Sequence, residues 1–321
     1  MAAFRPVRAG LTMEIAGRRG HAVMALVAVA LAALPFWASG YVLQLASNAL
    51  VASMFALSLQ MLVGGAGMVS LGHAAFFGIG AYAVYLLPSP VSLLVSLPVA
   101  AALAGLTALL VGGFAVRAQK FYFLMVTLAF GQMLFFLFHD TALGGGKDGV
   151  FVTRPALSLF GWEYGVARRD RAAVSLWLNL AVMVGLYALA VWFMRTLYGR
   201  ALQGIRANEH RMVALGFDAR RLKLGVFALA GAMAGVAGHQ AAMTEAFVNP
   251  ELLGWHRSAE ALLMILLGGI GALHGPLLGA FAYVGLAEVA QMVTERQRLV
   301  QGVVILAAVL VLRRGIAGVL R

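Results

Sequence analysis

Residues 64–82 read GGAGMVSLGHAAFFGIGAY; they follow one apolar run, 41–63, and continue into a second, 70–87. Glycines that interrupt a membrane helix leave backbone N–H and C=O groups unpaired. Hydrocarbon tolerates such groups only where the segment lines a cavity or packs against protein. Broken helices of this kind often mark binding sites in membrane proteins. The stretch therefore predicts a break between Gly64 and Gly72; a plain loop whose glycines allow close helix packing is the alternative.

The composition is that of a membrane protein. Of the 321 residues, 62% are hydrophobic and only 11% are charged, and the mean hydropathy is +0.91. A water-soluble core cannot hide that much apolar surface. A membrane-spanning helix needs about 20 apolar residues, so the chain has room for about eight to ten spans. The absence of cysteine excludes disulfides, thiol nucleophiles, cysteine zinc sites and iron–sulfur clusters.

Apolar stretches bounded by Gly, Pro or charged residues give ten candidate membrane spans: 22–38, 41–63, 70–87, 91–114, 121–138, 173–194, 223–247, 258–270, 275–293 and 299–312. We therefore expect an all-α polytopic membrane protein with about eight to ten transmembrane helices, some of them broken or re-entrant. The stretch 258–270 is short enough to be re-entrant. The spans form one predicted transmembrane domain, 22–321, behind a cytoplasmic tail, 1–21.

The net charge of +12 is spread over short basic clusters between the apolar runs. This distribution follows the positive-inside rule, which places Lys and Arg in short cytoplasmic loops. It does not form the single basic face that nucleic acid would need, so we expect no nucleic-acid partner. Ten crossings, beginning with a first span that is not a cleaved signal, place both termini in the cytoplasm. The loop 139–172 is then external and the segment 195–223 cytoplasmic.

The segment 195–223 is patterned rather than merely polar. Asn208 and Glu209 are expected at a helix start, and Gly216 at a helix stop. A short helix between two spans can dock into a groove of a cytoplasmic partner. A solvated loop that only satisfies the positive-inside rule is the alternative. The apolar positions predict two short amphipathic helices, with these residues on their apolar faces: Ala201, Leu202 and Ile205, then Met212, Val213 and Leu215.

Four motifs resemble those of a known family. They are Gly64–Tyr82, Thr127–Gly131, Leu267–Gly271 followed by Gly275-Pro276, and Ile205-Arg206-x-Asn208-Glu209 followed by Ala214-Leu215-Gly216. Over nearly its whole length after residue 40, the chain is similar to the permeases of branched-chain amino acid ABC transporters, especially the longer of their two permease types. It departs from the family pattern at Arg211 and Met212, where small alanines are usual, and at Gln132 and His274.

This resemblance implies a membrane-spanning permease subunit of an ATP-driven importer in the bacterial inner membrane. The expected solutes are branched-chain or other amino acids, or related small polar solutes such as amides or urea. The expected partners are a second permease subunit, two cytoplasmic ATPase subunits, a periplasmic solute-binding protein and membrane lipid. An ion-coupled secondary transporter or a channel that works alone is the alternative, because broken helices suit it equally well.

Two groups of residues are the candidate sites. The resemblance assigns contact with the ATPase to Ile205, Arg206, Asn208, Glu209, Ala214 and Gly216. The substrate pathway is expected at the broken stretch and at one intramembrane acid, namely Gly64, Gly67, Ser70, Gly72, His73 and Glu288. Ser70 and His73 would supply hydrogen bonds, and the ends of half-helices would recognise a carboxylate or an ammonium group. An acid inside the membrane is costly, and Glu288 lies deeper in its span than Glu245 and Glu260.

The chain shows no catalytic signature. The run Gly144-Gly145-Gly146-Lys147 looks like a phosphate-binding loop, but Asp148 stands where Ser or Thr is needed and the loop is external. The seven histidines are scattered, without metal-ligand or triad spacing. A lone buried histidine such as His73 is more often a structural donor than a ligand. We expect no catalytic residue, metal or cofactor, with ATP hydrolysis on separate subunits.

Overall fold

The computed structural model describes residues 18–87, 92–118, 121–153, 158–159, 162–163, 170–293, 296–311 and 315–319. The predicted tail 1–21 therefore falls largely outside the described residues. The α-helices in the described part are α1 Arg18–Ala33, α2 Gly40–Gln60, α3 His73–Leu86, α4 Leu93–Ala115, α5 Phe121–His139, α6 Arg171–Arg195, α7 Leu197–Ala207, α8 Glu209–Ala214, α9 Ala219–Glu245, α10 Trp255–Gly268, α11 Gly275–Val293, α12 Gln297–Val311 and α13 Ile316–Val319.

The remaining elements are short. A short π-helix, Met61–Ala66, follows α2 and is called the π-turn below. The 3-10 turns are Leu34–Phe36, Ala142–Gly144, Gly146–Asp148 and Pro250–Leu253. The strands are β1 Val150–Phe151, β2 Ser158–Leu159, β3 Trp162–Glu163 and β4 Phe247–Val248. The fold is all-α, as the sequence predicts.

Among the described residues, five helices are long and apolar enough to cross a membrane: Gly40–Ala66, which joins α2 to its π-turn, together with α4, α5, α6 and α9. The shorter apolar helices are Met24–Phe36 and His73–Leu86. Each of these helices falls on a predicted span. The chain is therefore a multi-pass membrane protein.

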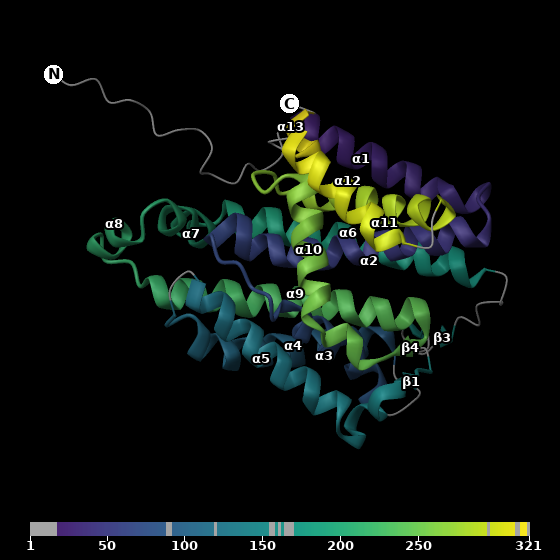
Figure 1. The fold of residues 1–321 in the computed structure, drawn as a ribbon, viewed down its shortest axis with the longest axis horizontal. Coiled ribbons are helices and arrows are strands. Elements are labelled where there is room, and N and C mark those ends of the chain that lie inside the picture. Colours follow the sequence, from purple (N-terminus) through teal and green to yellow (C-terminus); the bar gives the residue numbers. More distant parts are fainter. Residues whose placement is uncertain are drawn as a thin grey trace.

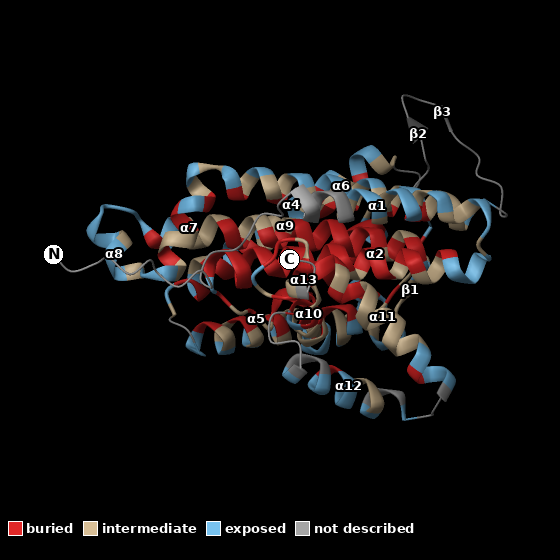
Figure 2. Cartoon of the chain, turned by 90° about the horizontal axis from the view of Figure 1, so that it is seen from above, coloured by how far each residue is buried: buried red, intermediate tan, exposed pale blue. Residues whose placement is uncertain are grey.

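α2 lies at the centre of the bundle. In the apolar window of α2 and its π-turn, 94% of the residues are buried, against 28% for α4, 22% for α5 and 28% for α6. α2 packs against α6, α9 and α11, and α9 packs against α3 and α4. The buried residues in Figure 2 follow α2 and α9. α4 and α6 instead expose apolar side chains such as Leu110 and Trp192, which suits a lipid environment.

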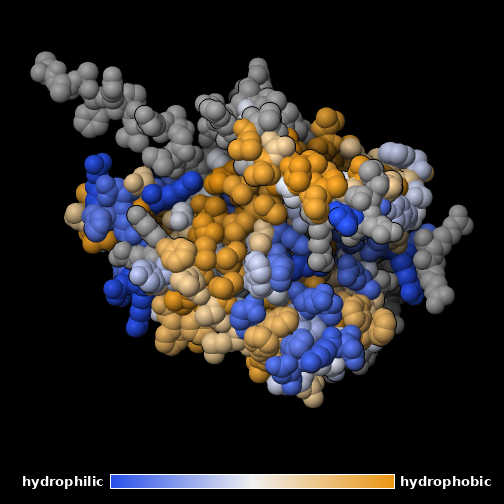
Figure 3. All heavy atoms as spheres, viewed as in Figure 1, coloured by the Kyte–Doolittle hydropathy of each residue, from blue (hydrophilic) through white to orange (hydrophobic). Residues whose placement is uncertain are grey.

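The long helices run along the length of the molecule in Figure 1, with α7 and α8 together at one end. β1 and β4 lie at the opposite end, where they pair antiparallel with Val150 opposite Val248. α10 runs across the direction of its neighbours. Figure 3 shows hydrophilic residues around α7 and α8 and toward the opposite end, with hydrophobic surface between them. This is the layout of a membrane domain with two polar ends.

Candidate functional site

The chain breaks between α2 and α3. The π-turn Met61–Ala66 extends α2, and Gly67 then takes a left-handed conformation (φ 71°) that ends the helix. Residues 68–72 are not helical, and α3 begins at His73. The break therefore begins at Gly67 and not at Gly64, because the π-turn keeps Gly64 in a helical conformation. Single π-turns are frequent at functional sites.

Two buried side chains connect α2 and α3 to α10 and to the turn that follows it. The Ala74 amide, in the first turn of α3, donates a hydrogen bond to Ser258 Oγ of α10 at 2.8 Å. Gln60 Nε2, at the end of α2, donates to the Ile270 carbonyl at 2.6 Å, just after α10. Ser258 and Gln60 are fully buried. The bundle can hold a broken helix because protein groups pair with its backbone.

Ser70 and His73 are fully buried at the break. His73 Nε2 lies 2.8 Å from Ser58 Oγ, and its ring stacks on Phe55 with the centroids 5.6 Å apart. Ser70 Oγ and His73 Nδ1 have no hydrogen-bond partner in the part of the chain that the structure describes. Buried polar atoms are nearly always paired. His73 is therefore a structural group through Nε2 and a candidate solute ligand through Nδ1, and Ser70 is a second candidate.

Gly72 lets the break pack directly on α5. A Cβ added at Gly72 would lie 1.9 Å from the Thr127 carbonyl oxygen, and one added at Gly131 would lie 2.8 Å from the Gly72 Cα. Thr127–Gly131, a separate motif in the sequence, thus forms the part of α5 against which the break packs. The third membrane motif contacts the end of α2 through the bond from Gln60 to Ile270.

Glu288 does not lie with the other pathway candidates. It is half-buried on α11, where Oε1 accepts a hydrogen bond from the Tyr41 hydroxyl at the start of α2. The break follows the other end of α2, roughly 30 Å away at 1.5 Å per residue. Glu260 pairs with Arg257 at 3.4 Å, and Glu245 is exposed at the end of α9. The five candidates from Gly64 to His73 are neighbours, and Glu288 is separate.

The segment 195–223 folds into two helices, as its apolar pattern predicts. Asn208 Oδ1 caps α8 by accepting a hydrogen bond from the Arg211 amide at 3.0 Å. At the other end Gly216 has φ 88°, and its amide donates to the Val213 carbonyl at 2.9 Å. A left-handed glycine just past the last turn is the usual end of a helix. Both ends of α8 follow from its own sequence.

α7 and α8 differ in how far their side chains are buried. α7 buries Leu202 and Ile205 and contacts the π-turn and α9. α8 has no buried residue, and Val213 and Leu215 are exposed by 53% and 68%. α7 is thus part of the bundle, whereas α8 projects from it with uncovered apolar side chains. Ile205, which is expected at a contact with the ATPase, is instead buried in the bundle.

Charged side chains are among the groups that join α7 and α8 to the rest of the bundle. The Arg206 guanidinium, on α7, donates a hydrogen bond to the Gly64 carbonyl in the π-turn. Lys223 Nζ, on α9, lies 2.6 Å from Glu209 Oε1 on α8, and the Lys223 side chain is largely buried. Burial lowers the pKa of the Arg206 guanidinium, which still keeps its charge because arginine titrates far above neutral pH. Arg206 and Glu209 therefore bind groups of the bundle.

Comparison with known proteins shows the family. The family model for the permease component of the branched-chain amino acid transport system matches residues 41–309. The chain belongs to this family. The matched range contains the break, the motifs that pack on it and the segment 195–223. The permease is therefore a transport subunit of an ABC transporter.

The permease is 29% identical over 301 residues to the high-affinity branched-chain amino acid transport system permease protein LivM of Escherichia coli (strain K12). The aligned region covers 87% of this chain and 70% of LivM. It is 29% identical over 165 residues to the ribose import permease protein RbsC of the same strain, covering 48% of this chain and 49% of RbsC. The probable branched-chain amino acid transport permease protein LivM of Methanocaldococcus jannaschii is 28% identical over 143 residues, 40% of each chain. No solved structure matches the permease.

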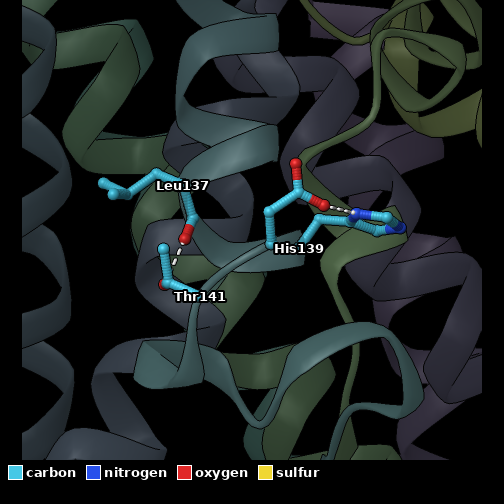
Figure 4. Close-up of polar contacts among 4 residues, drawn as sticks. Leu137, His139 and Thr141 are labelled. Atoms are coloured by element: carbon cyan, nitrogen blue, oxygen red, sulfur yellow. Dashed lines mark hydrogen bonds and ion pairs between the residues drawn. The ribbon is translucent and has the colours of Figure 1, made fainter.

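A polar hollow of about 500 Å³ opens at the end of the permease opposite α7 and α8, beside the last residues of α5. Its lining includes His139, Asp140 and Lys147. His139 Nδ1 lies 2.6 Å from Asp140 Oδ1, and the Thr141 hydroxyl donates to the Leu137 carbonyl (Figure 4). The glycine run that looked like a phosphate-binding loop forms short 3-10 turns here. The hollow presents charges of both signs.

Sequence reasoning missed the side chains that hold the break together, Ser58, Gln60 and Ser258. Each is a polar residue in an apolar stretch, and a polar side chain buried in a membrane protein needs a partner. That signal was strongest at Gln60, which stands in the run 41–63 and is fully buried. Among the described residues, no group of three or more His, Cys, Asp or Glu side chains could hold a metal ion.

Proposed function

We propose that this permease imports branched-chain or other amino acids, or a related small polar solute such as an amide or urea, with ATP hydrolysed on separate subunits. The observation that carries the proposal is α8, a capped helix that projects from one end of the bundle (Figure 1). Its exposed Leu215 and Val213 have no cover among the described residues. Apolar side chains on a projecting helix suit a groove on a partner, which is a common way for helices to dock.

The solute path runs through the break between α2 and α3. Ser70 Oγ and His73 Nδ1 supply its hydrogen bonds, and the α3 N-terminus, with its partial positive charge, favours a carboxylate. Both side chains are buried, so this conformation is closed to solute. Glu288, at the far end of α2, contacts the ammonium group of a solute elsewhere on the path. The residues along the break are Gly64, Gly67, Ser70, Gly72 and His73.

Four further subunits complete the importer. They are a second permease, two cytoplasmic ATPase subunits and a periplasmic solute-binding protein. The ATPase contacts α8 through the exposed side chains around Ala214 and Gly216. The binding protein docks at the opposite end, where the hollow lined by His139, Asp140 and Lys147 offers polar partners. The surrounding bacterial inner membrane supplies lipid to the exposed apolar faces.

The permease crosses the membrane with both termini in the cytoplasm, the loop 139–172 outside and the segment 195–223 inside. The placement of α7 and α8 at one end and of β1 and β4 at the other supports one part of this proposal, that the two segments lie on opposite sides of the membrane (Figure 1). A reporter enzyme that works only in the cytoplasm is expected to be active when it is fused after Lys223. A reporter enzyme that works only in the periplasm is expected to be active when it is inserted at Arg154. The reverse pattern would overturn the orientation and the role of α8.

An affinity pull-down tests the proposal as a whole. The permease is solubilised from its native membrane in mild detergent, and the bound proteins are identified by mass spectrometry. An ATPase and a second permease in the bound fraction support the importer. A preparation without any ATPase that still transports solute after reconstitution alone would replace this proposal with a stand-alone secondary transporter or channel.

A further inference from the structure

Arg206 lies where the segment that carries α8 meets the break. Its guanidinium donates a hydrogen bond to the Gly64 carbonyl, which belongs to the π-turn at the end of α2. Its methylene groups pack on Gly67, where an added Cβ would lie 3.0 Å from Arg206 Cγ. Gly67 is the residue that ends the helix. One side chain therefore contacts both the last turn before the break and the first residue of the break.

α7 places Arg206 against the break and connects it to α8. Leu202 and Ile205, on the same helix, are buried in the bundle. The Tyr198 hydroxyl donates to the Leu222 carbonyl at 3.0 Å, which ties the start of α7 to α9. Asn208, the cap of α8, follows Arg206 after a single residue. Because no flexible linker separates them, a movement of α8 acts directly on Arg206.

An arginine suits the chemistry at this position better than any other side chain. The last carbonyls of a helix have no amide partner in that helix, and water is excluded here because Gly64 is buried. The planar guanidinium carries five donors and stays charged, so it can bond the carbonyl while its methylene groups cover Gly67. Loss of this contact leaves a buried carbonyl unpaired next to the non-helical residues 68–72.

We infer that Arg206 is a positioning residue of transport. It holds the Gly64 turn in the closed arrangement, and it releases that turn when a cytoplasmic partner displaces α8. The inference rests on the proposed function for its role in an ATP-driven cycle. It gives Arg206 a place inside the permease, between the helix that meets the partner and the residues that meet the solute, rather than at the partner's surface.

Single-cysteine labelling tests the inference in the full chain, because the protein has no cysteine of its own. Ser70→Cys places a thiol at the buried break, and its reaction with N-ethylmaleimide is timed in inverted membrane vesicles. Adding Arg206→Gln is expected to raise the labelling rate at least tenfold, and adding Arg206→Lys to raise it less. Arg200→Gln, an exposed position on the same helix, is the matched control and should change nothing.

Ser53→Cys reports whether the whole bundle has loosened. Ser53 is fully buried on α2, and its Oγ donates to the Ala49 carbonyl of its own helix at 2.7 Å. With Arg206→Gln, faster labelling at Ser70→Cys and unchanged labelling at Ser53→Cys supports the inference. Equal rates at Ser70→Cys with and without Arg206→Gln, or a parallel rise at both thiols, would overturn it.

A second readout separates this inference from the proposed function. In the assembled importer, Arg206→Gln is expected to keep most ATP hydrolysis and to lose at least nine-tenths of solute uptake, with Arg206→Lys restoring part of it. Normal uptake by Arg206→Gln would overturn the inference and leave the importer intact. The labelling experiment needs no ATPase, so it remains decisive for Arg206 even if the pull-down fails to recover one.

Discussion

Ser258 Oγ lies 2.8 Å from the amide nitrogen of Ala74, so a residue of α10 caps the first turn of α3. Helices are usually capped by a polar side chain at the residue before their first turn. Here that residue is Gly72, which has no side chain and cannot be larger because it packs on Thr127. The start of α3 therefore depends on the position of α10.

Ser258→Ala is expected to lower the free energy of unfolding by about 1–2 kcal/mol, because the buried Ala74 amide loses its acceptor. Ser47 is the matched control. It is also buried, on α2, and its Oγ has no hydrogen-bond partner among the described residues, so Ser47→Ala should cost little or nothing. The thermal midpoint of the purified permease in detergent measures both. Equal midpoints for the two variants would contradict the cap.

Ser70→Ala is expected to weaken solute binding without unfolding the permease. Loss of one hydrogen bond costs about 1 kcal/mol, which raises the KM for uptake about five- to tenfold. Ser53→Ala removes a hydroxyl that bonds to the Ala49 carbonyl within α2, and it should leave KM unchanged. Uptake of radiolabelled solute by the assembled importer in vesicles provides the comparison. A normal KM for Ser70→Ala would remove Ser70 from the solute path.

Gly72→Ala is expected to destabilise the permease by about 2–3 kcal/mol, since overpacking forces backbone apart. The added Cβ would meet the Thr127 carbonyl oxygen at 1.9 Å, and backbone atoms cannot rotate away. Gly185→Ala, on α6, places a Cβ that has no atom of the described residues within 4 Å, and it should be neutral or stabilising. Monodisperse yield on size exclusion, together with the thermal midpoint, tests the pair. Similar behaviour of both variants would show that α5 can yield at the break.

Gly216→Arg is expected to abolish uptake while the permease still inserts into the membrane. Gly216 has a left-handed backbone (φ 88°), which costs a residue with a Cβ about 1–2 kcal/mol. No atom of the described residues lies within 4 Å of a Cβ added at Gly216, so the bundle itself can accept a large side chain. Gly216→Asn is the control, because asparagine tolerates this backbone and is small. Normal uptake by a well-expressed Gly216→Arg would argue against docking at α8.

Local sequence predicts local structure well in this chain. The cap at Asn208 and the stop at Gly216 depend on residues within one turn of each other, and both were predicted. The all-α membrane fold follows from composition and apolar run length. The break was also predicted, although the π-turn delays its start to Gly67. The extra residue of a π-turn has no periodic signature in a uniformly apolar stretch.

The assembly of the site could not be predicted from one sequence. Gln60 bonds to Ile270 and Ser258 bonds to Ala74, and such pairs, far apart in the chain, leave no trace in local periodicity. For the same reason Glu288 was grouped with the break, although it bonds to Tyr41 at the far end of α2. The family resemblance assigns Arg206 to a contact with the ATPase; its bond to the Gly64 carbonyl is a tertiary contact that the motif does not reveal.

α10 binds both sides of the break. Near its beginning Ser258 bonds to the first turn of α3, and just past its end Ile270 bonds to Gln60, the last residue of α2. Ile270 lies beyond Gly269, which ends α10 with a positive φ of 109°. α10 and the turn after it therefore connect α2 to α3. We expect a displacement of α10 to act on both half-helices, so that the break opens in one cooperative step.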